Sequence, residues 1–337
     1  MKNTALLALG VLACTGAAAF DASDKPDARA MRESQDQADD PPRLGSHFTR
    51  EEHERRREDL EHRRERETLE DAEREARRDA KRPARTPPSP NMTYHGGKIM
   101  TTVVSKAIFW GPKWADPAFA KDKITGLDNW YTYHSGSNYA AASNEYTGSN
   151  GKVGSTGLLH LGHVIDTTKA SNGAITSAIL GEVCRMIPTP DPQGNGYYPV
   201  YTDVRRGRAG YCAWHSYGTC HGIPVQFGFF FDLEGDSGCD PGDNPAITGH
   251  SQGLAALANV TGHEIAEARS DPANPGAWYD PQGAENGDKC AWTFNTPYVT
   301  FSDGGKWRIQ GEWSNAAYNN KTGYANLSGQ KGCLDGH

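Results

Sequence analysis

The segment His263-Glu264-Ile265-Ala266-Glu267 contains residue types that can hold a metal ion and activate water. On a helix, His263 and Glu267 project from one face, which allows two side chains to hold one ion. In the zinc-peptidase pattern HExxH, two histidines bind the metal and the intervening glutamate takes a proton from metal-bound water. Here Glu267 replaces the second histidine, and carboxylate oxygen is also a zinc ligand. We therefore predict His263 and Glu267 as ligands, Glu264 as general base and Zn²⁺ as cofactor, with Mn²⁺ or Ca²⁺ as harder alternatives.

A third ligand has to come from another element, and the acidic segment 283–290 offers Glu285 and Asp288. The sequence does not separate these two carboxylates, so both remain candidates. The competing interpretation is that the HExxE residues are ordinary polar residues on a solvated helix face, because so short a pattern arises by chance. Convergence of Glu285 or Asp288 on the helix motif would favour the metal site.

A second motif, Gly249-His250-Ser251-Gln252-Gly253, fits the GxSxG nucleophile elbow of serine hydrolases. That elbow needs a buried strand before it, but residues 240–248 include prolines and a glycine that disfavour one. A suitable later histidine is also missing. We interpret Ser251 as the N-cap of the metal-site helix.

Seven cysteines are present, and removal of Cys14 with an N-terminal leader leaves an even number. Six cysteines suit three disulfides in an oxidising compartment, and the chain has no CxxC pair that would favour a cysteine-rich zinc site. We expect Cys290 to pair with Cys333 and so to fix the acidic segment. The predicted disulfide cysteines are Cys184, Cys212, Cys220, Cys239, Cys290 and Cys333.

The first 90 residues differ in composition from the rest. Residues 1–19 have the basic start, apolar run and small residues of a signal peptide, with a weak likeness to a lipoprotein leader as the alternative. Residues 20–48 have the composition of a disordered segment, 49–82 that of a charged, solvated helix, and 83–90 that of a proline-rich linker. We expect the folded domain to span 91–337 and residues 20–90 to be dispensable for folding.

Short apolar runs of strand length occur at 101–110, 158–165, 225–233 and 298–301, bounded by glycine, proline, asparagine or aspartate. Helical spacing of apolar residues is clearest at 251–269, with 170–185 as a second helix. The sequence therefore predicts an α+β fold, a single domain with a twisted sheet packed on a few helices, preceded by the charged helix.

Six motifs in the predicted domain together resemble bacterial relatives of the plant EXORDIUM, or phosphate-induced, family. They are Tyr94-His95-Gly96-Gly97, Phe109-Trp110-Gly111, Leu161-Gly162-His163-Val164, Gly210-Tyr211-Cys212-Ala213-Trp214-His215, residues 263–272 and residues 285–292. The resemblance implies a secreted protein with a zincin-like helix, His263 and Glu267 as ligands, Glu264 as base, and Asp288 or Glu285 as the remaining ligand. Plant members lack the helix motif. We expect the other histidines, His95, His134, His160, His163, His215 and His221, to satisfy local hydrogen bonds. In the alternative that one of them is a ligand, His163 and His215 are favoured because they lie in these motifs.

The net charge of −7 argues against a nucleic-acid partner, and no stretch after the leader is apolar enough to span a membrane. We predict a secreted metal-dependent hydrolase, a peptidase that uses metal-activated water on a peptide or cell-surface polymer. The alternative is a non-catalytic extracellular protein that binds cell wall or a surface receptor. Periplasmic or lipid-anchored placement is the alternative to full secretion. The oligomeric state is left open.

Overall fold

The computed structural model describes residues 40–76, 89–154, 156–295 and 298–337. The chain divides into a unit Met1–Asp40 and a unit Pro41–His337. Of the first unit, only Asp40 is among the described residues. The predicted signal peptide and residues 20–39 of the predicted disordered segment lie outside the described residues. So do residues 77–82 of the predicted charged helix and residues 83–88 of the predicted proline-rich linker.

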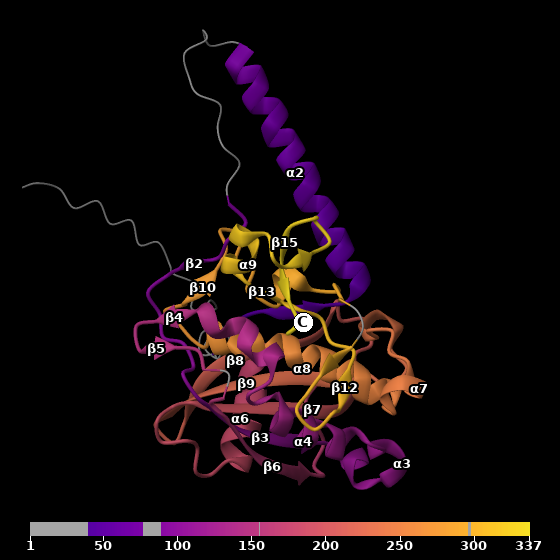
Figure 1. The fold of residues 1–337 in the computed structure, drawn as a ribbon. Coiled ribbons are helices and arrows are strands. Elements are labelled where there is room, and N and C mark those ends of the chain that lie inside the picture. The colour runs from indigo at the N-terminus through magenta and orange to yellow at the C-terminus, as the bar shows by residue number, and fades with distance from the viewer. Residues whose placement is uncertain (1–39, 77–88, 155, 296–297) are drawn as a thin grey trace, which may run out of the picture. The chain divides into compact units, whose positions relative to one another are not determined.

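A mixed six-stranded sheet forms the centre of the domain (Figure 1). Its order is β1 (Ser46–Phe48), β8 (Tyr211–Cys220), β9 (Ile223–Asp232), β7 (Gly196–Arg205), β3 (Val103–Trp110) and β6 (Leu158–Asp166). The strands β6, β3, β7 and β9 are parallel, whereas β8 is antiparallel to β9 and β1 is antiparallel to β8. The central strands are buried on both faces, which explains their continuous apolar and aromatic runs.

Helices cover both faces of this sheet. On one face, α8 (Gln252–Ser270) and α4 (Lys123–His134) pack together, and the Tyr201 hydroxyl of β7 lies 2.8 Å from Thr261 Oγ1 of α8. On the other face, α6 (Thr176–Met186) packs Leu180 closely against Gly218 of β8. Since side chains alternate along a strand, His215 of β8 points to the α8 face. The fold is therefore α+β, a single domain with helices packed on a twisted mixed sheet.

The remaining helices and strands complete the described part of the chain. The 3-10 helices are η1 (Pro112–Ala115), η2 (Ala142–Glu145), η3 (Ser237–Cys239) and η4 (Asp288–Cys290), and the remaining helices are α2 (Arg50–Ala76), α3 (Pro117–Ala120), α5 (Asn138–Ala141), α7 (Pro245–Thr248) and α9 (Asn315–Asn320). The remaining strands are β2 (Thr93–Tyr94), β4 (Thr147–Gly148), β5 (Gly151–Lys152), β10 (Trp278–Tyr279), β11 (Val299–Thr300), β12 (Lys306–Trp307), β13 (Glu312–Trp313), β14 (Tyr324–Ala325) and β15 (Lys331–Leu334).

Three disulfides join these elements. They are Cys184–Cys220, Cys212–Cys239 and Cys290–Cys333, so the predicted pairing of Cys290 with Cys333 is confirmed. The last one connects η4 to β15. Three disulfides are typical of proteins from oxidising compartments. Among the described residues, no helix is both long and apolar enough to cross a bilayer.

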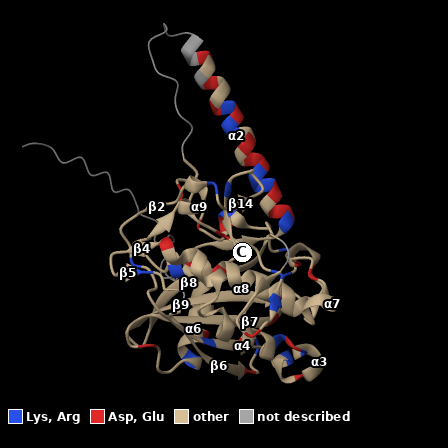
Figure 2. Cartoon of the chain, viewed as in Figure 1, with Lys and Arg blue, Asp and Glu red and all other residues tan. Residues whose placement is uncertain are grey.

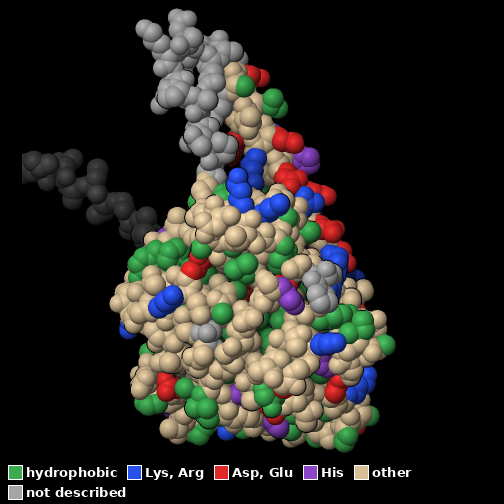
Figure 3. Space-filling view, in the orientation of Figure 1, with side chains coloured by type: hydrophobic (Ala, Val, Ile, Leu, Met, Phe, Trp, Pro, Cys, Tyr) green, Lys and Arg blue, Asp and Glu red, His purple; other side chains and the backbone are tan. Residues whose placement is uncertain are grey.

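The charged helix α2 carries acidic and basic side chains along its described length (Figure 2). Glu52 pairs with Arg56 at 2.7 Å, and Arg57 pairs with Glu61 at 2.8 Å, each four residues apart. Charged side chains also predominate on its visible side in the space-filling view (Figure 3). The apolar Leu69 is exposed, as expected for a helix without an apolar seam.

The boundary between the N-terminal region and the domain differs from the prediction. Residues 46–48 form strand β1 and are not disordered, and the domain does not begin close to Asn91, because His47 is fully buried in it. The first turn of α2 also contacts the domain, where Arg50 donates to the carbonyl of Asp240 at 3.0 Å. A strand of only three residues is too short to show an alternation of apolar and polar side chains, so the sequence did not reveal β1.

Candidate functional site

The helix α8 places the HExxE side chains in the interior of the domain. Ser251 caps this helix by accepting from the backbone of Leu254, as predicted. Every residue from Gly253 to Ser270 is buried, including polar ones, so α8 has no solvated face. The relative exposure is 1% for His263 and 0% for both Glu264 and Glu267. The interpretation as polar residues on a solvated helix face is therefore wrong.

His263, Glu267 and Asp288 come together at one point. His263 Nε2 lies 3.1 Å from Glu267 Oε1 and 3.7 Å from Asp288 Oδ1. The candidate ligand atoms of all three residues lie within 4.8 Å of one another. The backbone N–H of Asp288 also donates to Glu267 Oε1 at 2.9 Å, which holds the start of η4 against α8. Of the two acidic candidates, Asp288 is thus the one that contacts the helix motif directly.

The second acidic candidate, Glu285, faces a histidine that comes from the sheet. His215 Nε2 of β8 lies 3.3 Å from Glu285 Oε2 and 3.6 Å from Glu267 Oε2. His215, Glu264 and Glu267 form a second group whose candidate ligand atoms lie within 4.8 Å of one another. Glu267 belongs to both groups. His215 was favoured among the remaining histidines but was not one of the predicted metal ligands.

Several buried polar atoms at this point have no hydrogen-bond partner among the described residues. They are His215 Nδ1, His215 Nε2, His263 Nε2, Glu264 Oε2, Glu267 Oε2 and Glu285 Oε2. Buried polar atoms are nearly always hydrogen-bonded, so such a concentration points to a ligand that these atoms share. Imidazole nitrogen and carboxylate oxygen together fit a divalent cation.

Burial changes the protonation of these side chains. It raises the pKa of Glu267 to about 8 and, together with repulsion from Glu267, that of Asp288 to about 7. Burial also lowers the pKa of His263 to about 4 and that of His215 to about 3. Both imidazoles are therefore neutral at neutral pH, which is the form that binds a metal, while the carboxyls hold protons that a cation would displace.

Gln310 links the site to neighbouring loops, although no sequence pattern marks it. Its amide Nε2 donates to the carbonyl of Gly287 at 2.9 Å and lies 3.0 Å from His263 Nδ1. Its backbone N–H donates to Asn259 Oδ1 of α8 at 2.9 Å. Gln310 is completely buried and so fixes the orientation of the His263 ring.

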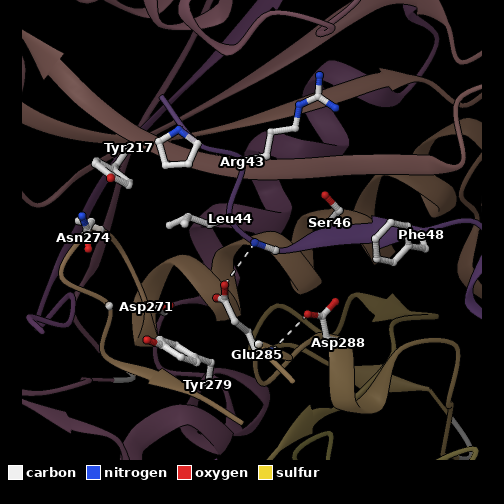
Figure 4. Close-up of a pocket in the computed structure, with 15 residues that line it drawn as sticks. Arg43, Leu44, Ser46, Phe48, Tyr217, Asp271, Asn274, Tyr279, Glu285 and Asp288 are labelled. Atoms are coloured by element: carbon white, nitrogen blue, oxygen red, sulfur yellow. Dashed lines mark hydrogen bonds between the residues drawn. The ribbon is translucent and has the colours of Figure 1, made fainter. Parts of the chain in front are cut away.

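A cleft of about 540 Å³ opens beside this cluster (Figure 4). Its walls include Glu285 and Asp288 on one side and residues 42–46 on the other. The Glu285 carboxylate points toward the N-terminal segment and accepts from the backbone of Gly45 at 3.2 Å. The cleft is large enough for part of a peptide.

The serine of the GxSxG motif has a structural role. Ser251 follows the short helix α7 rather than a strand, and its hydroxyl donates to the Asp122 carboxylate. None of the described histidines is hydrogen-bonded to Ser251 Oγ. The geometry therefore agrees with an N-cap rather than a nucleophile.

His163 lies outside the cluster around His263 and Glu267. His163 Nδ1 and His160 Nε2 lie 2.6 and 2.9 Å from the two oxygens of Asp128 in α4, and Ser105 Oγ lies 2.8 Å from His160 Nδ1. This chain of residues is similar in composition to a serine-hydrolase triad, but Ser105 is completely buried in β3. A buried serine without access cannot attack a substrate, so the cluster pins α4 to β6.

Comparison with known proteins gives no relative for this chain: no family model, curated protein or solved structure matches it. The resemblance to the EXORDIUM family therefore stays a prediction.

Proposed function

We propose that this protein is a secreted metal-dependent hydrolase that cleaves peptides. The observation that carries the proposal is the convergence of His263, Glu267 and Asp288, with buried atoms that lack partners among the described residues. Burying so many ionisable groups destabilises a fold unless a ligand compensates. The three disulfides support an oxidising compartment and so favour secretion.

In this proposal His263, Glu267 and Asp288 bind the metal. A set of one imidazole and two carboxylates suits Zn²⁺ or Mn²⁺ better than Ca²⁺, because Ca²⁺ prefers oxygen ligands alone. Once bound, such an ion polarises a carbonyl and lowers the pKa of a coordinated water. Gln310 keeps the His263 ring in place for this role.

Glu264 is the proposed general base. It neighbours His263 on α8, and its Oε2 atom has no partner among the described residues. Burial first, and then repulsion from Glu267, raise the pKa of Glu264 well above its ordinary value. A nearby cation would counter this shift, so Glu264 could accept a proton from water and pass it to the leaving amine.

His215 and Glu285 form a pair beside Glu267. Glu285 Oε2 lies 3.3 Å from His215 Nε2 and can orient the imidazole. Burial keeps His215 neutral, so its single N–H donates either to Glu285 or to the oxygen that gains charge as the carbonyl is attacked. We propose these two residues as positioning and stabilising groups rather than metal ligands.

The test is hydrolysis of casein, gelatin and a peptide library by the full chain, with and without a chelator, beside Glu264→Gln. We expect a chelator-sensitive activity that the variant lacks. Activity that is equal in both proteins would contradict the role of Glu264 as general base. Stoichiometric metal binding without hydrolysis of any substrate would favour the extracellular binding protein.

A further inference from the structure

The N-terminal segment, residues 41–49, runs along the outer edge of β8. Strand β1 in this segment pairs Ser46 with Trp214 and His47 with Ala213 in antiparallel register. Before β1, the backbone of Leu44 donates to the carbonyl of His215 at 3.0 Å. The contact with β8 is thus made by main-chain groups, as in proteins that bind a peptide by adding a strand to a sheet edge.

The same segment crosses the proposed catalytic residues. The backbone N–H of Gly45 donates to Glu285 Oε1, and that of His47 donates to Glu264 Oε1, both at 3.2 Å. Figure 4 shows the segment extended over Glu285 and Asp288. The segment therefore occupies one of the two Glu264 carboxylate oxygens, Oε1.

Gly45 lies directly against a proposed ligand. A Cβ atom added at this position would lie 1.7 Å from Glu267 Oε2 and 3.1 Å from His215 Nε2. Only a glycine backbone fits so close to these groups.

Side chains on either side of Gly45 anchor the segment. The His47 ring packs edge-on against His263 and Trp292, with ring centroids 4.5 and 4.7 Å away. Arg43 donates to the carbonyl of Gly173 at 2.9 Å. These contacts are specific, yet the segment has no covalent link to the domain other than the chain itself, because the disulfides begin at Cys184.

We propose that the edge of β8 above α8 is the binding groove for an extended peptide, and that the N-terminal segment occupies it as an inhibitor in cis. The identification of the groove's ligand as a substrate rests on the proposed function. Release of the segment opens both the strand edge and the carboxylates of Glu264 and Glu285.

The test uses the full chain with Gly45→Ala, which disfavours the bound position of the segment, and Gly181→Ala as the matched control. Gly181 has no atom within 4 Å of an added Cβ. The probe is a fluorescent peptide with the sequence of residues 41–49. The apparent affinity for the probe is reduced in proportion to the fraction of protein whose groove is open. We therefore expect the probe to bind Gly45→Ala at least roughly tenfold more tightly than the control. A probe peptide that carries leucine in place of Gly45 should not bind.

Equal binding of the probe to both variants would overturn the proposal. Tighter peptide binding by Gly45→Ala without hydrolysis of casein would support the groove and contradict the proposed catalytic function. Hydrolysis of casein without a difference in peptide binding would support the catalytic function and contradict the groove.

A second measurement covers the outcome that Gly45→Ala does not fold. A specific protease site replaces residues 83–88 of the otherwise unchanged chain, and the protein is cut after folding. We expect the N-terminal fragment to be displaced by excess probe peptide while the domain keeps a cooperative melting transition. Loss of that transition on displacement, or a fragment that cannot be displaced, would show that β1 is a permanent structural strand.

Discussion

The Nε2 atom of His263 lies 3.7 Å from Asp288 Oδ1, although one residue belongs to a buried helix and the other begins a 3-10 helix 25 positions later in the chain. The disulfide between Cys290 and Cys333 holds the second element in the domain. This proximity of an imidazole to a carboxylate from another element distinguishes the arrangement from an ordinary pair within one helix.

The two glutamates of the motif should respond differently to substitution. Glu264→Gln preserves the shape of the site and should retain metal while turnover falls at least about 100-fold, because only proton transfer is lost. Glu267→Ala removes a ligand, so metal content and activity should fall together. Metal analysis beside a casein assay compares them. Loss of metal from Glu264→Gln would show that Glu264 is itself a ligand.

Asp288 and Glu285 can be separated by isosteric amides. Asp288→Asn should lose the metal, because its oxygen is the one near His263 Nε2. Glu285→Gln should keep the metal and lose turnover, because Glu285 faces His215. Metal content of the two purified variants is the measurement. The reverse pattern would make Glu285 the third ligand and require a shift of residues 283–290.

Metal affinity should rise with pH between about pH 6 and pH 8. In the metal-free protein the pKa is about 8 for Glu267 and about 7 for Asp288, so below these values each carboxyl holds a proton that the cation must displace. His263, with a pKa of about 4, is already neutral in this range and adds nothing. Affinity should gain up to roughly tenfold per pH unit for each proton displaced. Calorimetry in two buffers of different ionisation enthalpy counts the protons, and affinity that falls with pH would refute this protonation scheme.

The disulfide Cys290–Cys333 should matter for metal affinity as well as stability. It closes 43 residues, so its removal by paired serine substitutions should cost about 2–4 kcal/mol in the free energy of unfolding. Metal affinity should also fall, because Asp288 is two residues from Cys290. Removal of Cys184–Cys220 is the matched control and should destabilise the fold without a comparable change in affinity. Equal metal affinity in the two double variants would mean that the Cys290–Cys333 disulfide does not hold the acidic segment in place.

The parts of the fold that sequence patterns predicted are those that depend on local spacing. Ser251 and the apolar repeat after it predicted α8, and the strand-length run at 225–233 predicted most of β9. The pattern at 170–185 also indicated a helix, although α6 begins six residues later, at Thr176. Local patterns thus located the helix that carries the motif.

Other parts depend on contacts between distant segments. His215 becomes part of the site only because β8 lies beside β9 with its odd-numbered residues toward α8. Gln310 has no motif, and its position follows from loops held against α8. The N-terminal segment joins the sheet through its backbone, so its polar composition indicated disorder where the structure has a strand.

The most direct test of the account is the metal content of the full chain, isolated without chelators and offered Zn²⁺, Mn²⁺ or Ca²⁺, with His263→Ala as the reference. If His263, Glu267 and Asp288 form a metal site, mass spectrometry should find about one Zn²⁺ or Mn²⁺ per wild-type chain and almost none in the variant. A folded wild-type protein that binds none of the three ions stoichiometrically, or a variant that binds as much as the wild type, would contradict the proposed metal centre.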